Sequence, residues 1–220
     1  VQGENNLVID IPITVTDFDG DTSSSLNLPI TIVDDIPEIT SADALSLDED
    51  DLVDGSQLTN KDSLEATGNF DTVEGADTVV SYQLDLTSNP IPGVTSGGLS
   101  VTLVQTAVSN NNYTYQGQTP DGNSVFTVEL NADGSYKFTL EGILDHSVQG
   151  EDELTLNLPV FATDVDGDTA GITLPVSITD DVPTIYDASI SRVEGQGGRT
   201  VQLFTDPVEG DLNYGADGAE

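Results

Sequence analysis

Aspartates at alternate positions around a glycine are the residues of this sequence whose type and spacing could do chemistry. They occur in TDFDGDT at residues 16–22 and again in TDVDGDT at residues 163–169. Carboxylate oxygens are the ligands that calcium prefers. An Asp-Gly pair is also a favoured hairpin turn, so a polar turn without metal is the alternative. A turn needs only that pair, however, and three carboxylates so close together repel one another unless a cation lies among them. The candidate ligands are Asp17, Asp19, Asp21, Asp164, Asp166 and Asp168.

A second acidic pattern follows each of these segments. VDDIP at residues 33–37 and TDDVP at residues 179–183 supply Asp34, Asp35, Asp180 and Asp181. The proline stiffens the backbone and cannot continue a central strand, so a polar linker is the alternative to a ligand pair. The spacing of the 16–22 and 163–169 segments is not that of an EF-hand, which has glycine at position 6 and glutamate at position 12 of its loop.

Both patterns belong to a long internal repeat. Residues 1–22 align with residues 148–169 without a gap and are identical at more than half of the positions. The period is about 147 residues, which favours separately folded domains in tandem over a solenoid of short units. We expect the last strands of one repeat at residues 1–36, one complete repeat at 37–183, and the first strands of a third at 184–220. The chain is thus expected to be an internal piece of a larger protein.

The elements that must position these aspartates are strands. Apolar residues alternate with polar ones at residues 7–15, 26–32, 154–162 and 172–178, and further period-two runs lie between. NADGSY at residues 131–136 carries the Asp-Gly pair of a tight hairpin. No segment has a helical period. The pattern predicts an all-β fold of Ig-like or cadherin-like antiparallel β-sandwich repeats.

The order of the elements predicts how the two acidic patterns meet. If residues 154–178 form the last hairpin of a sandwich, its tip lies at the pole where the chain enters that domain. The final strand spans roughly 30 Å at about 3.3 Å per residue, so the tip cannot reach Asp180 and Asp181. We expect the tip to meet Asp34 and Asp35 instead. Asp180 and Asp181 would serve the next repeat, and the 16–22 segment would serve a preceding junction.

Composition limits the function. The 220 residues include 40 acidic and 4 basic ones, a formal net charge of −36. Such a chain does not suit nucleic acid or an anionic membrane surface, and bound calcium would relieve its self-repulsion. It has no cysteine, no stretch of about 20 apolar residues, and no phosphate-loop, HExxH or GxSxG motif. We therefore expect no enzyme and no membrane insertion.

Other polar groups have more ordinary interpretations. The single histidine, His146, is expected to be packed or to cap a turn, and residues 110–122 to form a mobile polar loop. Carboxylates at residues 47–51 and 70–77 are either further ligands or solvated surface groups.

The combination of motifs resembles a known family. TDxDGDT, DDxP, GADG at residues 215–218, NADGSYKFTL at 131–140 and LDH at 144–146 are similar to the long agglutinin or adhesin repeats of RTX-type bacterial proteins exported by type I secretion. The resemblance implies Ig-like extender domains, stiffened by calcium, in a giant adhesin at the extracellular surface of a bacterium. Calcium would fall on the hairpin tips and the DD junctions, with neighbouring repeats as partners.

The expected function is a calcium-stiffened spacer that projects adhesive domains for cell-surface or biofilm attachment. The alternative is a module of the same kind of adhesin that binds a glycan or a peptide through residues 87–123.

Overall fold

The described part of the computed structural model comprises residues 5–57, 59–184 and 216. Its regular structure consists of strands and one short 3-10 turn, η1 (Glu49–Asp51), and it contains no α-helix. No helix capable of crossing a membrane was found among these residues. The expected fold class, an all-β antiparallel sandwich, is confirmed.

The larger of the two main sheets has six antiparallel strands. Their order is β3 (Glu38–Ala42), β5 (Glu65–Val73), β12 (Ser135–Leu140), β11 (Ser124–Leu130), β10 (Asn112–Gln118) and β9 (Thr102–Ser109). The second sheet has the order β4 (Leu45–Asp48), β14 (Thr169–Thr179), β13 (Glu153–Asp164) and β6 (Val79–Leu84). In this sheet β4 pairs with β14 in parallel. Two short strands, β7 (Thr95–Ser96) and β8 (Leu99–Ser100), form a separate ribbon.

The core lies between these two sheets. Strand β13 alternates as predicted, so that its inward side chains are buried while their neighbours are partly or fully exposed. From the opposite sheet, Phe126 and Phe138 stack at 4.9 Å between ring centroids. Phe70 of β5 and Tyr82 of β6 stack at 5.0 Å, which joins the two sheets near one end. The long β13–β14 hairpin is therefore held by burial along most of its length.

Residues 110–122 are not the polar loop that their composition suggested. Asn112–Gln118 is strand β10, paired with both β9 and β11 in the larger sheet. Asn110 and Asn111 both have positive φ, 51° and 61°, the conformation of the tight turn that matches strand twist. The expectation of a loop was wrong because Tyr115 and Gly117 are the only buried residues of β10, and they leave little apolar period to read.

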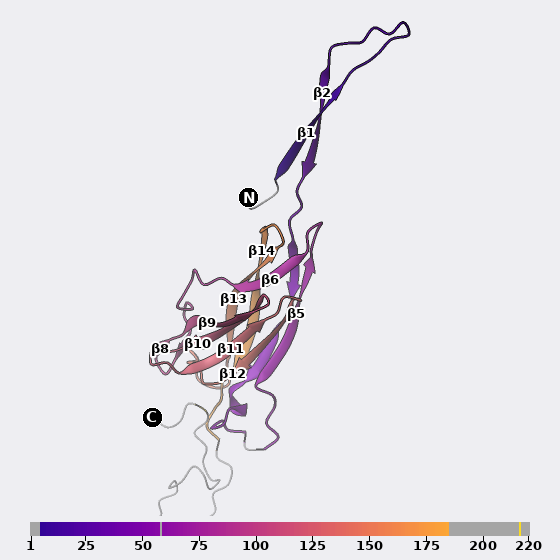
Figure 1. Cartoon of the computed structure of the whole chain (residues 1–220). Helices are drawn as coiled ribbons and strands as arrows, with labels where there is room; N and C mark the ends of the chain where they lie inside the picture. The colour runs from indigo at the N-terminus through magenta and orange to yellow at the C-terminus, as the bar shows by residue number, and fades with distance from the viewer. Residues whose placement is uncertain (1–4, 58, 185–215, 217–220) are drawn as a thin grey trace, which may run out of the picture.

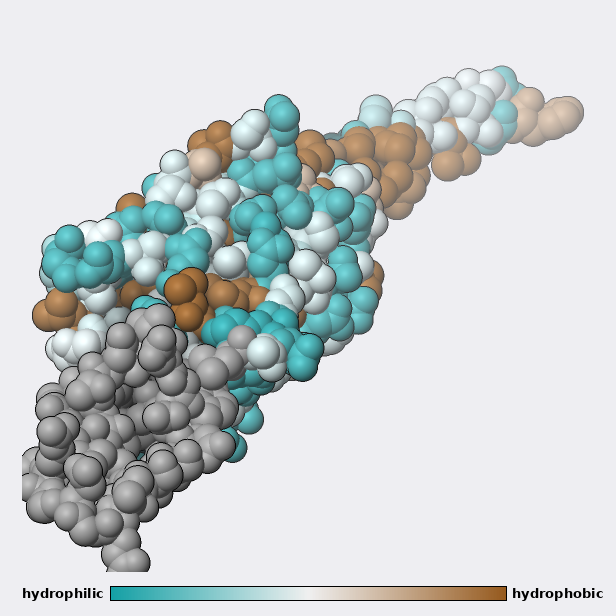
Figure 2. Space-filling view, turned by 90° about the horizontal axis from the view of Figure 1, so that it is seen from below, coloured by the Kyte–Doolittle hydropathy of each residue, from teal (hydrophilic) through white to brown (hydrophobic). Residues whose placement is uncertain are grey.

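The N-terminal hairpin extends away from the sandwich (Figure 1). Strands β1 (Asn6–Ile13) and β2 (Leu26–Val33) pair with each other alone, and every residue of both is exposed. Its apolar side chains form the brown region where the hairpin leaves the sandwich in Figure 2, and paler, more polar residues follow toward its tip. The sequence alignment equates β1 with β13, where the matching residues Leu156 and Leu158 are fully buried. The hairpin thus has the apolar side chains of a sandwich strand pair without a sheet to cover them.

Candidate metal centre

The tip of the β13–β14 hairpin is organised by the side chain of Asp164. Its Oδ1 accepts hydrogen bonds from the backbone N–H groups of Gly167, at 3.0 Å, and Asp168, at 2.7 Å. Gly167 has a φ of 102°, a conformation that favours glycine and explains its place in the motif. The resulting closed loop holds three carboxylates on one side of a tight turn.

Two of these three carboxylates are buried. Asp164 is 2% exposed and Asp168 is 1% exposed. One carboxylate oxygen each of Asp164, Asp166 and Asp168 lie within 4.8 Å of one another. The buried Oδ2 of Asp164 has no hydrogen-bond partner among the described residues. Because an ionised carboxylate out of water needs a partner, the arrangement suits a cation bound at the tip.

The junction supplies a second acidic group that shares Asp166. Single carboxylate oxygens of Asp34, Asp77 and Asp166 lie within 4.8 Å of one another. Asp34 comes from the segment between β2 and β3, and Asp77 from the loop between β5 and β6. The pKa of Asp166 is raised, first by a hydrogen bond with the Asp164 carboxyl group, then by desolvation and by the charges of Asp164 and Asp34. The metal-free chain therefore holds a proton more tightly at this position than at an ordinary aspartate.

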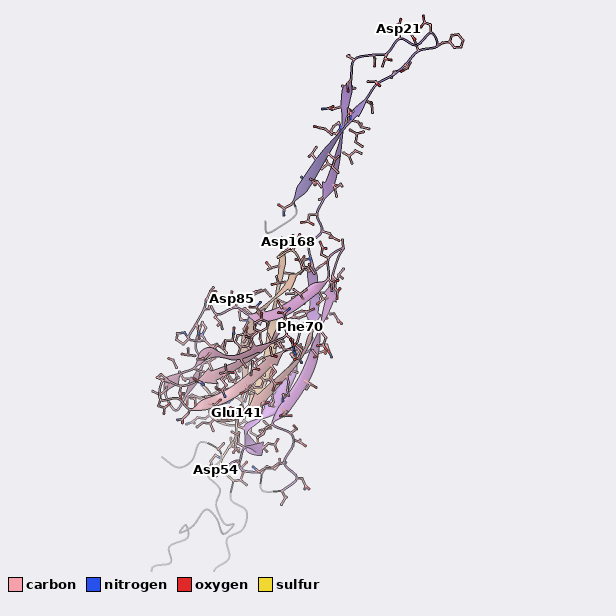
Figure 3. All side chains as sticks on the ribbon, in the orientation of Figure 1. Asp21, Asp54, Phe70, Asp85, Glu141 and Asp168 are labelled. Atoms are coloured by element: carbon pink, nitrogen blue, oxygen red, sulfur yellow. The ribbon has the colours of Figure 1, made fainter. Side chains whose placement is uncertain are left out.

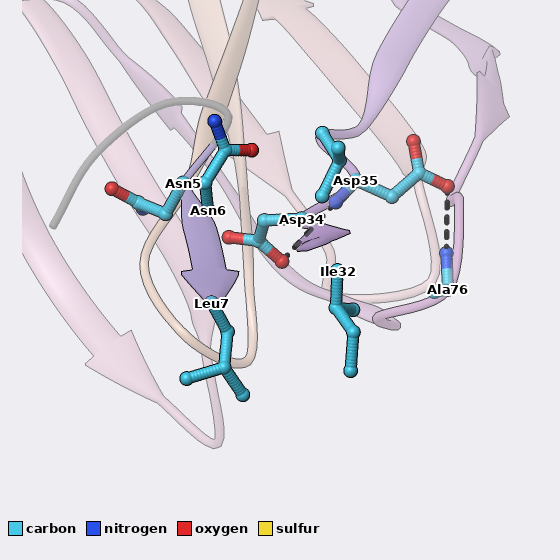
Figure 4. Close-up of a pocket in the computed structure, with 8 residues that line it drawn as sticks. Asn5, Asn6, Leu7, Ile32, Asp34, Asp35 and Ala76 are labelled. Carbon is cyan, nitrogen blue, oxygen red and sulfur yellow. Dashed lines mark hydrogen bonds between the residues drawn. The ribbon is translucent and has the colours of Figure 1, made fainter. Parts of the chain in front are cut away.

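Asp35 contacts the loop between β5 and β6. Its Oδ2 accepts a hydrogen bond of 3.1 Å from the backbone N–H of Ala76 (Figure 4). A Cβ atom on Gly75 would lie 2.8 Å from the same oxygen, so glycine is needed for this approach. The contact anchors the loop that carries Asp77. Asp35 is not a member of any of the acidic groups within metal-binding distance that the described residues form.

Asp34 is oriented by its own neighbours. Its backbone N–H donates to the carbonyl of Asn5 at 2.8 Å, and its Oδ1 accepts from the backbone N–H of Asp35 at 3.1 Å (Figure 4). The side chain lies at a recess of about 450 Å³ that is lined from the hairpin by Asn5, Leu7 and Ile32. The junction thus brings backbone and carboxylate oxygens from the N-terminal hairpin to the entrance of the sandwich.

The other hairpin tip has the same local geometry without a junction. Asp17 Oδ1 accepts from Gly20 at 3.1 Å and from Asp21 at 2.8 Å, and Gly20 has a φ of 103°. Asp17, Asp19 and Asp21 again have ligand atoms within 4.8 Å of one another, but all three are exposed. Asp21 lies at the far end of the hairpin, whereas Asp168 lies where the hairpin meets the sandwich (Figure 3).

The last two candidates, Asp180 and Asp181, directly follow β14 at the opposite end from the β13–β14 tip. Asp181 Oδ2 accepts from the backbone N–H groups of Ser56, at 2.8 Å, and Ala216, at 2.7 Å. The bond to Ala216 repeats the bond from Ala76 to Asp35, since both alanines stand in a Gly-Ala-Asp segment. Asp180 lies in a group with Glu49 and His146. Neither residue approaches the 163–169 segment of its own repeat.

Two features of the site had only weak signals in the sequence. Asp77 lies at the end of the 70–77 stretch, where a ligand role and a solvated surface were both open. Glu49 and His146 are far apart in the sequence, and no local spacing connects them. The third repeat expected at residues 184–220 lies outside the described residues apart from Thr184 and Ala216.

The fold and its acidic pole define an all-β sandwich with carboxylates gathered at the end where the N-terminal hairpin joins it. Among known families, the one described as "Domain of unknown function (DUF5801)" matches residues 44–177. The chain belongs to this family. No curated protein and no solved structure matches it.

The matched region covers the sandwich from β4 to β14. It excludes both DD junctions, and the family description names no activity. The similarity to adhesin repeats and the metal role of the ten aspartates stay predictions.

Proposed function

We propose that this chain is a calcium-stiffened spacer from a large bacterial surface adhesin. The observation that supports the proposal most directly is that Asp166 belongs to two acidic groups at once. It belongs to one acidic group made by the hairpin tip and to a second one completed by Asp34 of the junction. Calcium bound there would connect the N-terminal hairpin to the sandwich, because its ligands come from both sides.

Calcium fits this oxygen-rich site better than magnesium does. Calcium accepts 6–8 oxygen ligands in a flexible geometry, whereas magnesium demands a near-ideal octahedron. The junction offers carboxylates from three segments and an exposed Asp166 that leaves room for water. Extracellular modules bind calcium at about 10⁻⁴–10⁻³ M, which suits a chain that is loose at low calcium and ordered outside the cell. Metal binding then contributes to folding and to stiffness between domains.

The first experiment measures the angle between hairpin and sandwich. The chain contains no cysteine, so spin labels on introduced cysteines at Ser24 and Gln105, both exposed, are specific. We expect a narrow distance distribution in calcium and a broad one in EDTA. Asp166→Asn should broaden the distribution in calcium and lower the melting temperature. The proposal fails if the distributions with and without calcium coincide.

The chain offers a matched control for this substitution. Asp19 occupies the same place in its own tip as Asp166 does, but no described junction residue joins its group. Asp19→Asn should therefore leave the distance distribution unchanged. An equal effect of both substitutions would indicate a general charge effect and contradict a junction site.

The alternative of a glycan- or peptide-binding module has less support. Residues 87–123 contribute strands to the larger sheet and one wall of a recess of about 340 Å³. The described residues that line it include Ser96, Thr119 and Gly142 but no aromatic side chain. A ligand pocket is usually lined mainly by apolar and aromatic side chains around a few polar groups, so we favour the spacer.

A further inference from the structure

A buried cluster that contains the single histidine lies at the opposite end of the sandwich from Asp166. We call Glu49, His146, Asp152 and Asp180 the histidine cluster. Glu49 belongs to η1, and His146 belongs to the segment between β12 and β13. Asp152 precedes β13 and Asp180 follows β14, so both lie at the open end of that hairpin. Glu49 is 0% exposed, and the His146 side chain is 2% exposed. Four titratable groups therefore meet largely out of water.

The imidazole ring of His146 lies between carboxylates on both sides. Its Nδ1 is 3.2 Å from Asp152 Oδ1, and its Nε2 is 3.7 Å from Glu49 Oε1. One ligand atom each of Glu49, His146 and Asp180 lie within 4.8 Å of one another. Nε2 has no hydrogen-bond partner among the described residues. A nearly fully buried imidazole ring thus lies among the side chains of Glu49, Asp152 and Asp180.

The cluster is fixed by contacts with its own backbone. Leu144 N–H donates to Glu49 Oε1 at 2.7 Å, and Asp180 N–H donates to the carbonyl of Asp152 at 2.9 Å. The neighbouring Asp145 is not part of the cluster. Its carboxylate accepts hydrogen bonds from the backbone N–H groups of Gly97 and Gly98, at 2.7 and 2.8 Å. Glu49 is therefore held by a backbone contact that does not involve His146.

We propose that Glu49, His146 and Asp180 bind a divalent transition metal of the zinc type. A carboxylate beside Nδ1 fixes the tautomer that leaves the Nε2 lone pair available for a metal. Asp152 Oδ1 lies 3.2 Å from Nδ1, without a hydrogen bond between the two atoms in this structure, and we assign it this positioning role in the metal-bound state. Imidazole with carboxylates is a common donor set for zinc, whereas calcium takes oxygen ligands. The competing occupant is a proton, which would make His146 a cation among carboxylates.

This inference does not depend on the proposed function. The calcium ligands lie at the entrance of the sandwich, and the histidine cluster lies where the chain leaves it. Since Asp180 starts the exit junction, a metal bound to it would fix that junction to the body of the sandwich. The two sites use different metals and can be removed separately.

The experiment uses the full chain, purified without a polyhistidine tag and saturated with calcium. Titration with Zn²⁺ should show one site of higher affinity than the remaining surface carboxylates provide. Co²⁺ at the same site should give visible absorption bands that Zn²⁺ removes. His146→Gln should abolish both signals and leave calcium binding intact, and Asp152→Asn should weaken zinc binding about 10–100-fold. Asp166→Asn should retain zinc while losing calcium at the entrance.

A measurement on the unmodified chain keeps the test valid if variants do not fold. The imidazole NMR resonances are unambiguous because the chain has one histidine. Zn²⁺ should shift them in a 1:1 ratio at neutral pH. The proposal is overturned if the imidazole resonances are those of a protonated ring and do not shift when Zn²⁺ is added. It is also overturned if His146→Gln binds zinc as well as the original chain does.

Discussion

At the scale of single residues, the aspartates around the hairpin tip differ in the contacts that their side chains make. Asp164 accepts backbone hydrogen bonds and shapes a turn, while Asp35 anchors a neighbouring loop through Ala76. Among the described residues, no backbone N–H group donates to the side chain of Asp166, which belongs to two acidic groups. The positions that look equivalent in the sequence thus divide into those that build the site and those free to bind a cation.

The raised pKa of Asp166 predicts opposite effects of Asp166→Asn in EDTA and in calcium. Without metal, a raised folded-state pKa favours folding below the ordinary value of 3.8, and this contribution is lost as pH rises through the folded-state pKa. In EDTA, the melting temperature of Asp166→Asn should therefore rise relative to the original chain between pH 4 and pH 7. In calcium at pH 7 the order should reverse. Calorimetry at several pH values measures both, and a variant that is less stable in EDTA throughout would contradict the charge repulsion.

Residue patterns in the sequence anticipated only part of the candidate site. The motif spacing singled out Asp164, Asp166 and Asp168, and strand length separated them from Asp180. It did not reveal that Asp35 turns away toward Ala76, because a side-chain orientation has no signature in a DD pair. The histidine cluster was also missed, since Glu49 and His146 meet only after β4, β13 and β14 are assembled.

At the scale of elements, glycines in strands mark places where an aromatic ring lies flat against the backbone. Gly117 in β10 faces the ring of Phe126 in β11, and Gly68 in β5 faces the ring of Tyr136 in β12. Tyr136 also donates its hydroxyl hydrogen to the carbonyl of Asp43. Period-two patterns predicted β13 and β14 well because both are buried along most of their length. They failed for β10, whose polar residues and glycine carry little apolar signal.

Gly117→Ala should destabilise the sandwich. The added methyl group would overlap the Phe126 ring, and overpacking of this kind typically costs about 1–3 kcal/mol. Gly171→Ala in β14 is the matched control, because its methyl group would meet only the Val160 carbonyl, at an ordinary 3.7 Å. Urea denaturation should give a lower midpoint for Gly117→Ala and little change for Gly171→Ala. Equal midpoints for the two variants would argue against the ring contact.

At the scale of the whole molecule, the N-terminal hairpin is the least protected part. Leu7, Ile9 and Ile30 are 59%, 42% and 41% exposed, and an isolated two-stranded hairpin is only marginally stable in water. Large exposed apolar surfaces and open strand edges favour association between copies. The net charge of −36 opposes that association. The strength of the association should therefore depend on the concentrations of salt and calcium.

Deletion of residues 1–36 should therefore reduce self-association. Sedimentation velocity in calcium and moderate salt should show concentration-dependent oligomers for the full chain and monomers for the shortened one. Replacement of Ile9 and Ile30 by threonine tests the same surface without a deletion and should have the same direction of effect. Identical sedimentation of all three proteins would show that the hairpin is not the contact.

The parallel pairing of β4 with β14 has a mechanical consequence. The chain enters the sandwich at the end that holds Asp34 and leaves it at the end that holds Asp180, so tension along the molecule pulls these two strands in opposite directions along their axes. Their ladder runs from Leu45 and Val176 to Asp48 and Thr179, and its hydrogen bonds lie across that direction. Pulling loads all of them together in shear, whereas a hairpin pulled at its open end would lose them one by one. The sandwich is therefore built to resist stretching force along the line of the chain.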